Sequence, residues 1–166
     1  YMKRIVWIIV SCFITQWVSA QTLKWAEKAK KAVFSVVTYD KENKIKGTGN
    51  GFYIDGQGTA LSDYTLFENA ERAVIINTDG KQQIVNRILG ANSMYDIVKF
   101  NTPIDKKQMT LTIAAQPAKV GETVYLLPYS TQKATALQTG KVTSVDSIGN
   151  QSFYYTLEMK TGEKTV

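Results

Sequence analysis

The order of apolar and polar residues predicts short β-strands separated by turns over most of the chain. Residues 32–39 (Ala-Val-Phe-Ser-Val-Val-Thr-Tyr) are rich in β-branched and aromatic side chains, which favours a strand. Further strands with turn signals between them are predicted at residues 46–54, 59–62, 72–78, 81–91 and 95–100. Strands of about six residues with a turn every ten or so are typical of an all-β barrel or sandwich, not of a doubly wound sheet.

Glycines alternate through one of these predicted strands. Gly47, Gly49 and Gly51 occupy every second position, which suits a strand only where another backbone approaches closely or the strand bends. Residues 63–70 follow the returning strand and are predicted to form a short helical turn, with Asp63 as its N-cap.

The remaining segments divide into a helix, a linker and a second β half. Residues 22–31 predict an amphipathic helix capped by Thr22. The apolar residues available for one face of this helix are Leu23, Trp25, Ala26 and Ala29. Residues 101–118 contain two prolines and are predicted to link two halves, and residues 120–129, 139–145 and 152–159 predict further strands.

The N-terminal residues have the organisation of a secretory signal peptide. Lys3 and Arg4 precede an apolar run over residues 5–18, and Val18-Ser19-Ala20 places small residues before a cleavage site between Ala20 and Gln21. The run is shorter than the roughly 20 residues that a membrane-spanning helix needs, so no stable membrane anchor is expected. We expect export to the periplasm or the extracellular space, with lipidation at Cys12 as an alternative.

The glycine-containing hairpin resembles a known family. Gly-x-Gly-Phe at residues 49–52, the Asp-Gly-x-Gly turn at 55–58, Leu61-Ser62 and the short helix are similar to the first barrel of trypsin-like serine peptidases of the bacterial HtrA/Deg type. In that family the hairpin leads into Leu-Thr-Asn-x-His-Val. Leu61 and Ser62 match the Leu-Thr pair, and Thr65 falls where the catalytic histidine belongs.

Other segments extend the resemblance over residues 32–159. Asp79-Gly80-Lys81 is similar to the family's Asp-Gly-Arg/Lys hairpin, and residues 96–100 are similar to the strand whose aspartate orients the histidine. Asp96 thus occupies the position of the triad acid, although capping a strand start or loop is the role we favour for it here. Residues 120–129 and 139–145 resemble strands of the family's second half.

The resemblance implies a trypsin-like double β-barrel with a short N-terminal helix. The expected organisation is a signal peptide (1–20), a helical segment (21–31), a complete first barrel (32–102), a linker (103–118) and a partial second barrel (119–166).

The residues argue against peptidase chemistry. A positioned histidine normally serves as the general base, and the sequence contains no histidine. The family's Gly-Asn/Asp-Ser-Gly-Gly nucleophile segment does not occur in it either. The Thr65 hydroxyl is not a base near pH 7, so we expect Thr65 to be non-functional and Asp96 vestigial. A Ser-Lys dyad would need a buried lysine, and the nearby candidates, Lys46 and Lys99, are expected to be exposed.

Composition excludes several other functions. The formal net charge is +6, but the lysines are scattered, and the Lys28, Lys30 and Lys31 group is interpreted as a solvated helix face, not a nucleic-acid site. One cysteine and no histidine leave no ordinary zinc site. The acidic residues around Asp40 and Asp55 lack calcium-loop spacing, and residues 47–51 fit neither a P-loop nor a dinucleotide motif. No cofactor or metal is therefore predicted.

Tyrosines offer one further candidate surface. Six of them could line a ligand groove, although alternating core and surface positions on strands are the interpretation we favour. They are Tyr53, Tyr64, Tyr125, Tyr129, Tyr154 and Tyr155.

Three functions remain. The favoured one is an inactive peptidase-type domain that binds an extended peptide or an unfolded protein segment, since strand addition does not require a catalytic triad. The alternatives are a serine endopeptidase with altered residues, completed beyond Val166, and a purely structural β-barrel.

Overall fold

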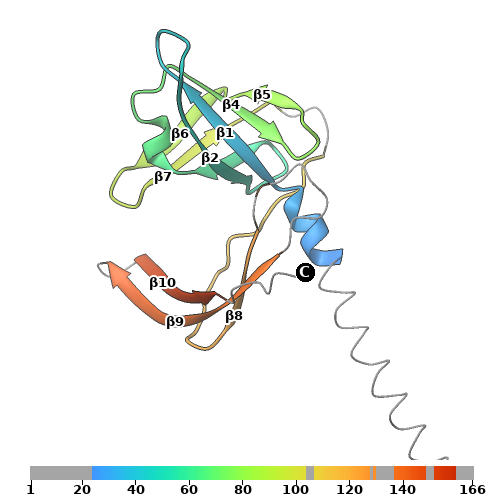
Figure 1. The fold of residues 1–166 in the computed structure, drawn as a ribbon, viewed down its shortest axis with the longest axis vertical. Helices are drawn as coiled ribbons and strands as arrows, with labels where there is room; N and C mark the ends of the chain where they lie inside the picture. The colour runs from blue at the N-terminus through green and yellow to red at the C-terminus, as the bar shows by residue number, and fades with distance from the viewer. Residues whose placement is uncertain (1–23, 104–106, 128, 130–136, 149–151, 160–166) are drawn as a thin grey trace, which may run out of the picture.

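The computed structural model describes residues 24–103, 107–127, 129, 137–148 and 152–159. These residues form a curled seven-stranded antiparallel sheet and a separate three-stranded antiparallel sheet (Figure 1). The all-β prediction is confirmed. The predicted signal peptide, its cleavage site, Cys12, Thr22 and Leu23 lie outside the described residues.

The strand order departs from the sequence order in the first sheet. Its spatial order is β5-β4-β1-β2-β3-β7-β6, and that of the second sheet is β10-β9-β8. The first sheet contains β1 (Val33–Tyr39), β2 (Ile45–Tyr53), β3 (Thr59–Ser62), β4 (Arg72–Asn77), β5 (Gln82–Ile84), β6 (Arg87–Asn92) and β7 (Ile97–Asn101). The second contains β8 (Thr123–Leu126), β9 (Gln138–Ile148) and β10 (Ser152–Met159), and the helical segments are residues 24–30 and α2 (Tyr64–Phe67).

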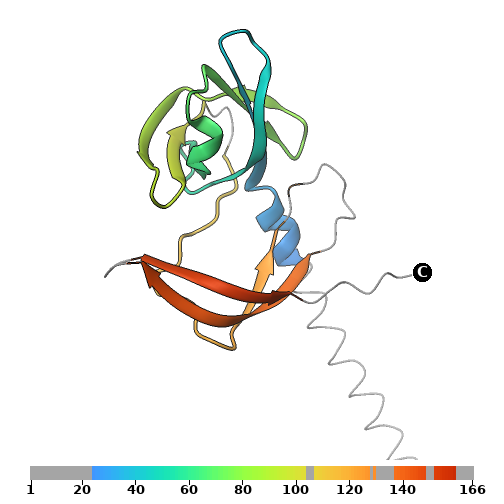
Figure 2. The same ribbon diagram turned by 60° about the vertical axis from the view of Figure 1, so that its left-hand side comes forward.

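One bend joins the two edges of the curled first sheet. The two edge strands, β5 and β6, are separated in sequence only by Val85 and Asn86. The Val85 amide donates to Ala73 O of β4 at 3.0 Å, and the Asn86 amide donates to Asn101 O of β7 at 2.9 Å. The chain thus passes from one edge of the sheet to the other within two residues (Figure 2).

This bend corrects one prediction. Residues 81–91 were expected to form a single strand, but they form β5 and most of β6. Both halves are extended, so local sequence pattern does not distinguish them from one strand. Only the change of hydrogen-bonding partner, from β4 to β7, separates them.

An aromatic cluster fills the inside of the curled sheet. Phe34 is fully buried; its ring centroid lies 4.8 Å from that of Tyr53 and 6.1 Å from that of Phe100. The Tyr53 hydroxyl is satisfied by Asn77 Oδ1 at 3.1 Å and Gln83 Oε1 at 3.2 Å. The remaining fully or nearly fully buried members are Val36, Ala60, Ile75 and Val98. Tyr53 is therefore a core residue, as the favoured interpretation of the tyrosines predicted.

The alternating glycines of β2 have close neighbours, but the predicted close approach of another backbone is found only at Gly51. A Cβ at Gly47 or Gly49 would meet the Leu66 side chain of α2. A Cβ at Gly51 would lie 2.5 Å from Phe34 Cε2 and 2.6 Å from the backbone oxygen of Leu61. The glycines thus let α2 pack directly onto β2 and let β3 approach the core.

Two element boundaries differ from the predictions. The helix expected over residues 63–70 is limited to Tyr64–Phe67, and Asn69 follows it with a positive φ of 55°. The strand expected from Tyr95 begins at Ile97, because Asp96 has a φ of 51°, which lies outside the extended region. The Tyr95 amide is instead bonded to Asn92 Oδ1 at 3.2 Å.

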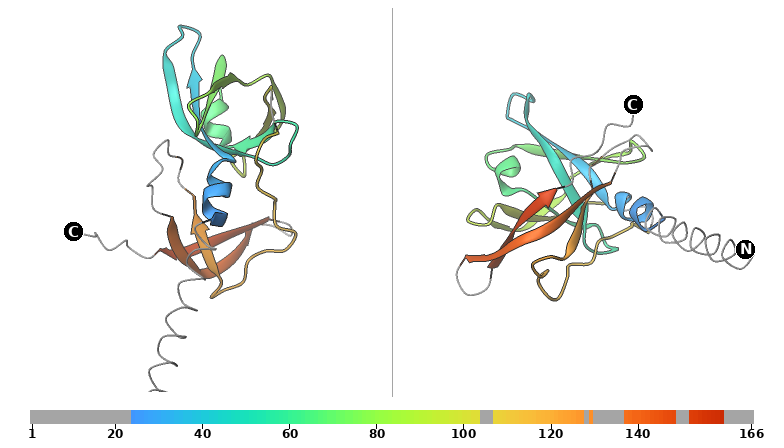
Figure 3. Two further views of the ribbon diagram at one scale, coloured as in Figure 1. Left: turned by 90° about the vertical axis from the view of Figure 1, so that its right-hand side faces the viewer. Right: turned by 60° about the horizontal axis from the view of Figure 1, so that its bottom comes forward.

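The N-terminal helix lies between the two sheets on one side of the molecule (Figure 3). Ala26 and Ala29 are buried, as predicted, whereas Trp25 is half exposed and its ring centroid lies 5.6 Å from that of Tyr125 on β8. β8 is shorter than the predicted strand over residues 120–129, and Gly121 before it has a φ of 86°. Within the described ranges, no helix is long and apolar enough to cross a membrane.

Candidate functional site

The register between β3 and β7 places the predicted site residues together. Ser62 is opposite Val98 in this antiparallel pair. Tyr64, two residues after Ser62, faces Asp96, two residues before Val98, and the Tyr64 amide donates to Asp96 O at 3.1 Å. Thr65 therefore starts α2 beside the turn that carries Asp96.

The Asp96 carboxylate binds Thr65 through two hydrogen bonds. Its Oδ1 accepts from the Thr65 amide at 2.7 Å and from the Thr65 hydroxyl at 2.8 Å. The left-handed backbone of Asp96 is one that aspartate tolerates better than most residues. The two residues matched to the acid and histidine positions are thus in direct contact.

Asp96 supplies the cap that was expected from Asp63. Asp63 occupies the N-cap position, but its side chain makes no capping hydrogen bond, so that part of the prediction is wrong. The first-turn amides of Tyr64 and Thr65 are bonded to Asp96 instead. Asp96 lies 31 residues from Thr65, and a sequence pattern within α2 does not reveal such a partner.

The two carboxylates have opposite pKa shifts. The hydrogen bond from the Thr65 amide, followed by that from its hydroxyl, lowers the pKa of Asp96 below 3.8. Partial burial, and then repulsion from Asp96, raises the pKa of Asp63 above 3.8. Asp96 is therefore the more strongly stabilised anion.

Replacing Thr65 by valine tests this assignment. We expect the pKa of Asp96 to rise toward 3.8, because the hydroxyl donor is lost while the amide donor remains. A carboxyl-carbon NMR titration measures the change. Because folding lowers the pKa of Asp96, its stabilising contribution is present above its unfolded-state pKa and is lost as pH falls through the folded-state value. The Thr65→Val variant should therefore lose less stability than the native protein on acidification. An unchanged pKa would contradict the assignment.

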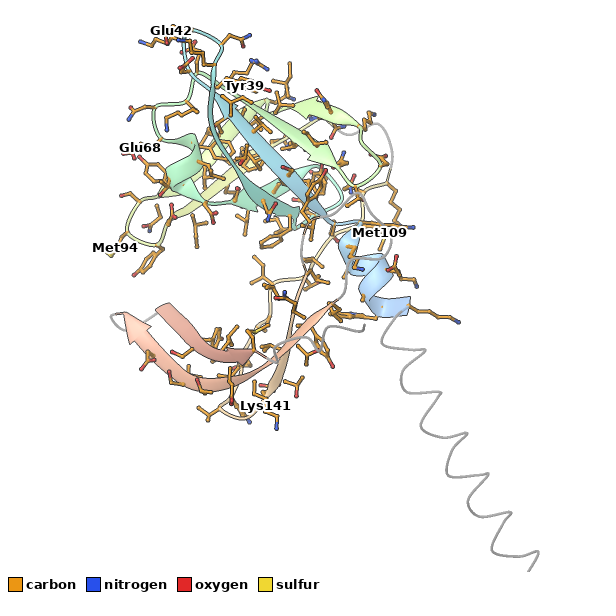
Figure 4. All side chains as sticks on the ribbon, in the orientation of Figure 1. Tyr39, Glu42, Glu68, Met94, Met109 and Lys141 are labelled. Carbon is orange, nitrogen blue, oxygen red and sulfur yellow. The ribbon has the colours of Figure 1, made fainter. Side chains whose placement is uncertain are left out.

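A groove of about 490 Å³ lies between the two sheets and includes both carboxylates in its lining. We call it the inter-sheet groove. Asp96 lies in the turn between β6 and β7, which begins near Met94; Figure 4 labels Met94 on the side of the first sheet that faces the second. The large apolar side chains that line the groove include Phe52, Leu61, Ile97, Leu111, Tyr125 and Leu126.

The groove combines exposed apolar surface with negative charge. Ile97 is 47%, Tyr125 43% and Leu126 51% exposed, although all three are large apolar or aromatic residues. Asp63 and Asp96 are the only charged side chains among the described residues that line it. The arrangement suits a ligand that is partly apolar and not anionic.

The other candidate residues lie elsewhere. Lys46 and Lys99 are exposed, as expected. Asp40 Oδ1 accepts from the Lys44 amide, and Asp55 Oδ1 accepts from the amides of Gln57 and Thr59, so these carboxylates hold turns. The described part of the chain contains no group of three His, Cys, Asp or Glu residues placed to hold a metal ion.

Sequence reasoning identified only part of this site. Tyr125 was a candidate groove residue, and Asp96 and Thr65 were singled out by the resemblance. Asp63, Ile97 and Leu126 were not identified as groove residues. Asp63 could have been noticed, because it is an acidic residue directly after Leu61-Ser62. Its position at the start of the predicted helix favoured a capping role instead.

Comparisons with known proteins add no further constraint. A search with protein-family models found no match to the sequence, and a search of curated proteins found none either.

Proposed function

We propose that this protein is a trypsin-like peptidase domain, similar to the HtrA/Deg type, that binds an extended peptide or an unfolded protein segment without cleaving it. The observation that carries the proposal is the inter-sheet groove, which leaves three large apolar side chains exposed beside the positions matched to the catalytic residues. The predicted signal peptide supports action in the periplasm or outside the cell.

The contact between Thr65 and Asp96 supports an inactive site. The hydroxyl of Thr65 donates to the carboxylate that would otherwise orient a histidine. Asp96 is engaged in capping α2, and threonine supplies no base near pH 7. This local structure can therefore persist without catalytic chemistry.

Strand β8 offers backbone groups to a peptide. It is an edge strand in the order β10-β9-β8, with β9 as its partner within the described sheet. An edge strand presents amide and carbonyl groups to which an extended segment can add. Because Tyr125 and Leu126 of β8 also line the groove, a segment added at this edge would place its side chains in or beside the groove.

A peptide-binding measurement tests the proposal. Fluorescently labelled, unstructured decapeptides with apolar centres should raise fluorescence anisotropy when the protein is added. Replacing Leu126 by aspartate should weaken binding about tenfold or more, because it places a charge in the apolar lining. Leu157→Asp is the matched control, since Leu157 is 40% exposed on β10 and does not line the groove. Absence of binding, or equal effects of the two substitutions, would overturn the proposal.

Restoring a histidine separates binding from catalysis. We expect Thr65→His to show no hydrolysis of a fluorogenic casein substrate above the native chain, because the family's nucleophile segment does not occur in the sequence. Thr65→Asn is the control for the loss of threonine. Hydrolysis by the native chain would favour the alternative of an altered serine endopeptidase. Hydrolysis by the histidine variant alone would show that a serine elsewhere serves as nucleophile.

A further inference from the structure

We propose that the inter-sheet groove selects a peptide segment that carries a lysine or arginine next to a large apolar residue, with the cation held at Asp63 and Asp96. This inference rests on the proposed peptide-binding function and names the class of peptide.

The charge of the groove is opposite to that of the chain. The sequence has 20 lysines and arginines against 14 acidic residues, yet the described lining contains two aspartates and neither lysine nor arginine. A cationic side chain entering the groove thus meets two negative groups and no lining cation. An acidic segment would meet repulsion from the same pair.

Asp63 is the carboxylate available to such a cation. It makes no capping bond to α2, and no other described residue forms a hydrogen bond or ion pair with it. Asp96 Oδ1, in contrast, already accepts two hydrogen bonds from Thr65. The repulsion between the two carboxylates, which contributes to the raised pKa of Asp63, is relieved when a cation binds.

The apolar requirement follows from the neighbour of Asp96. Ile97 is next to it in sequence, lines the groove and is 47% exposed. Leu126 lies in the same lining and is 51% exposed. A ligand with a large apolar residue adjacent to its cation can cover this apolar surface while its charge reaches the aspartates.

The same features disfavour other ligands. Nucleic acid requires positive side chains for its phosphates, and the described lining has none. A divalent cation usually takes more oxygen ligands than this pair supplies, and one Asp96 oxygen already accepts two bonds. A lysine or arginine side chain needs only one or two acceptors and brings an apolar stem.

The test uses three decapeptides that differ at one position. Each has a Val-Leu-X centre flanked by glycine and serine, with X as lysine, glutamine or glutamate, and binding to the full chain is followed by anisotropy. At low salt we expect the lysine peptide to bind about fivefold more tightly than the glutamine peptide, and the glutamate peptide to bind most weakly. High salt should reduce these differences.

Two variants that each remove one negative charge test whether Asp63 causes the preference for the lysine peptide. Asp63→Asn should reduce the preference for lysine over glutamine to less than about twofold, because asparagine keeps the size of the side chain but removes its charge. Asp79→Asn is the control, because Asp79 is an exposed aspartate in the β4–β5 turn and does not line the groove. It should retain the native preference.

The outcomes distinguish this inference from the proposed function. Binding of the glutamine peptide with no gain from lysine, or a preference that survives Asp63→Asn, overturns the cation site but leaves peptide binding intact. Failure of all three peptides overturns both. Sedimentation of the unliganded chain as a dimer that Asp63→Lys dissociates would show that a second copy occupies the groove, which also overturns the inference.

Discussion

Replacing Phe34 by alanine should lower the free energy of unfolding by about 3–5 kcal/mol. Phe34 is fully buried at the centre of the aromatic cluster and contacts both Tyr53 and Phe100. Removing the Phe34 ring leaves a cavity, and the strands of the curled sheet around it have limited freedom to move inward and fill it. Because small domains are typically stable by only about 5–15 kcal/mol, this change should be visible in urea unfolding followed by circular dichroism.

Ile45→Ala provides the control for this experiment. Ile45 begins β2 on the same sheet but is 65% exposed, so its truncation should change stability by no more than about 0.5 kcal/mol. If the alanine variant at Phe34 does not fold, Phe34→Leu should still show a clear but smaller loss. Equal effects at positions 34 and 45 would contradict the description of the core.

Replacing Gly51 by alanine should cost about 3 kcal/mol of stability. The added methyl group would lie 2.5 Å from Phe34 Cε2 and 2.6 Å from Leu61 O. The second contact is with backbone, so β3 has to move away from β2. Gly51 pairs with Ser62, which precedes Asp63, so the substitution should also weaken the proposed peptide binding.

Gly56→Ala tests whether the stability loss at Gly51 comes from the crowded surroundings of that position or from the loss of a glycine as such. Gly56 lies in the turn between β2 and β3, and a Cβ there would meet nothing within 4 Å. Its substitution should change the urea midpoint little. A large loss at Gly56, or no loss at Gly51, would show that β3 does not approach the core as described.

The local pattern of apolar and turn residues was sufficient to predict several strands of both sheets. The turn at Asp55 is encoded by its own residues, since Asp55 Oδ1 accepts from Gln57 and Thr59, and β3 has the predicted bounds. β10 also has the predicted bounds, Ser152–Met159. Both strands pair with the strand that precedes them, β2 for β3 and β9 for β10, and alternation and turn residues report such local pairing well.

The errors occur where a distant segment decides the structure. The bend at Val85 and Asn86 follows from a change of partner strand, and the start of β7 is delayed because Asp96 turns to bond α2. The groove has the same origin, because its lining comes from the first sheet and its turns, from Leu111, and from β8 with the residue that follows it. The family resemblance identified Asp96 and the aromatic pattern identified Tyr125 as candidates, but only tertiary structure shows that both line one groove.

The way in which α2 is held has a consequence for the order of folding. A helix of four residues is not stable alone. Leu66 packs on glycines of β2, and Thr65 is bonded to Asp96, 31 residues away, so α2 requires both β2 and the β3–β7 pair. The β1–β2 and β2–β3 hairpins need only short loops to close, whereas β3 and β7 are joined by a long one. We therefore expect the contact between Thr65 and Asp96 to form late, so that in newly made chains the proposed peptide-binding groove is complete only when the first sheet has finished assembling.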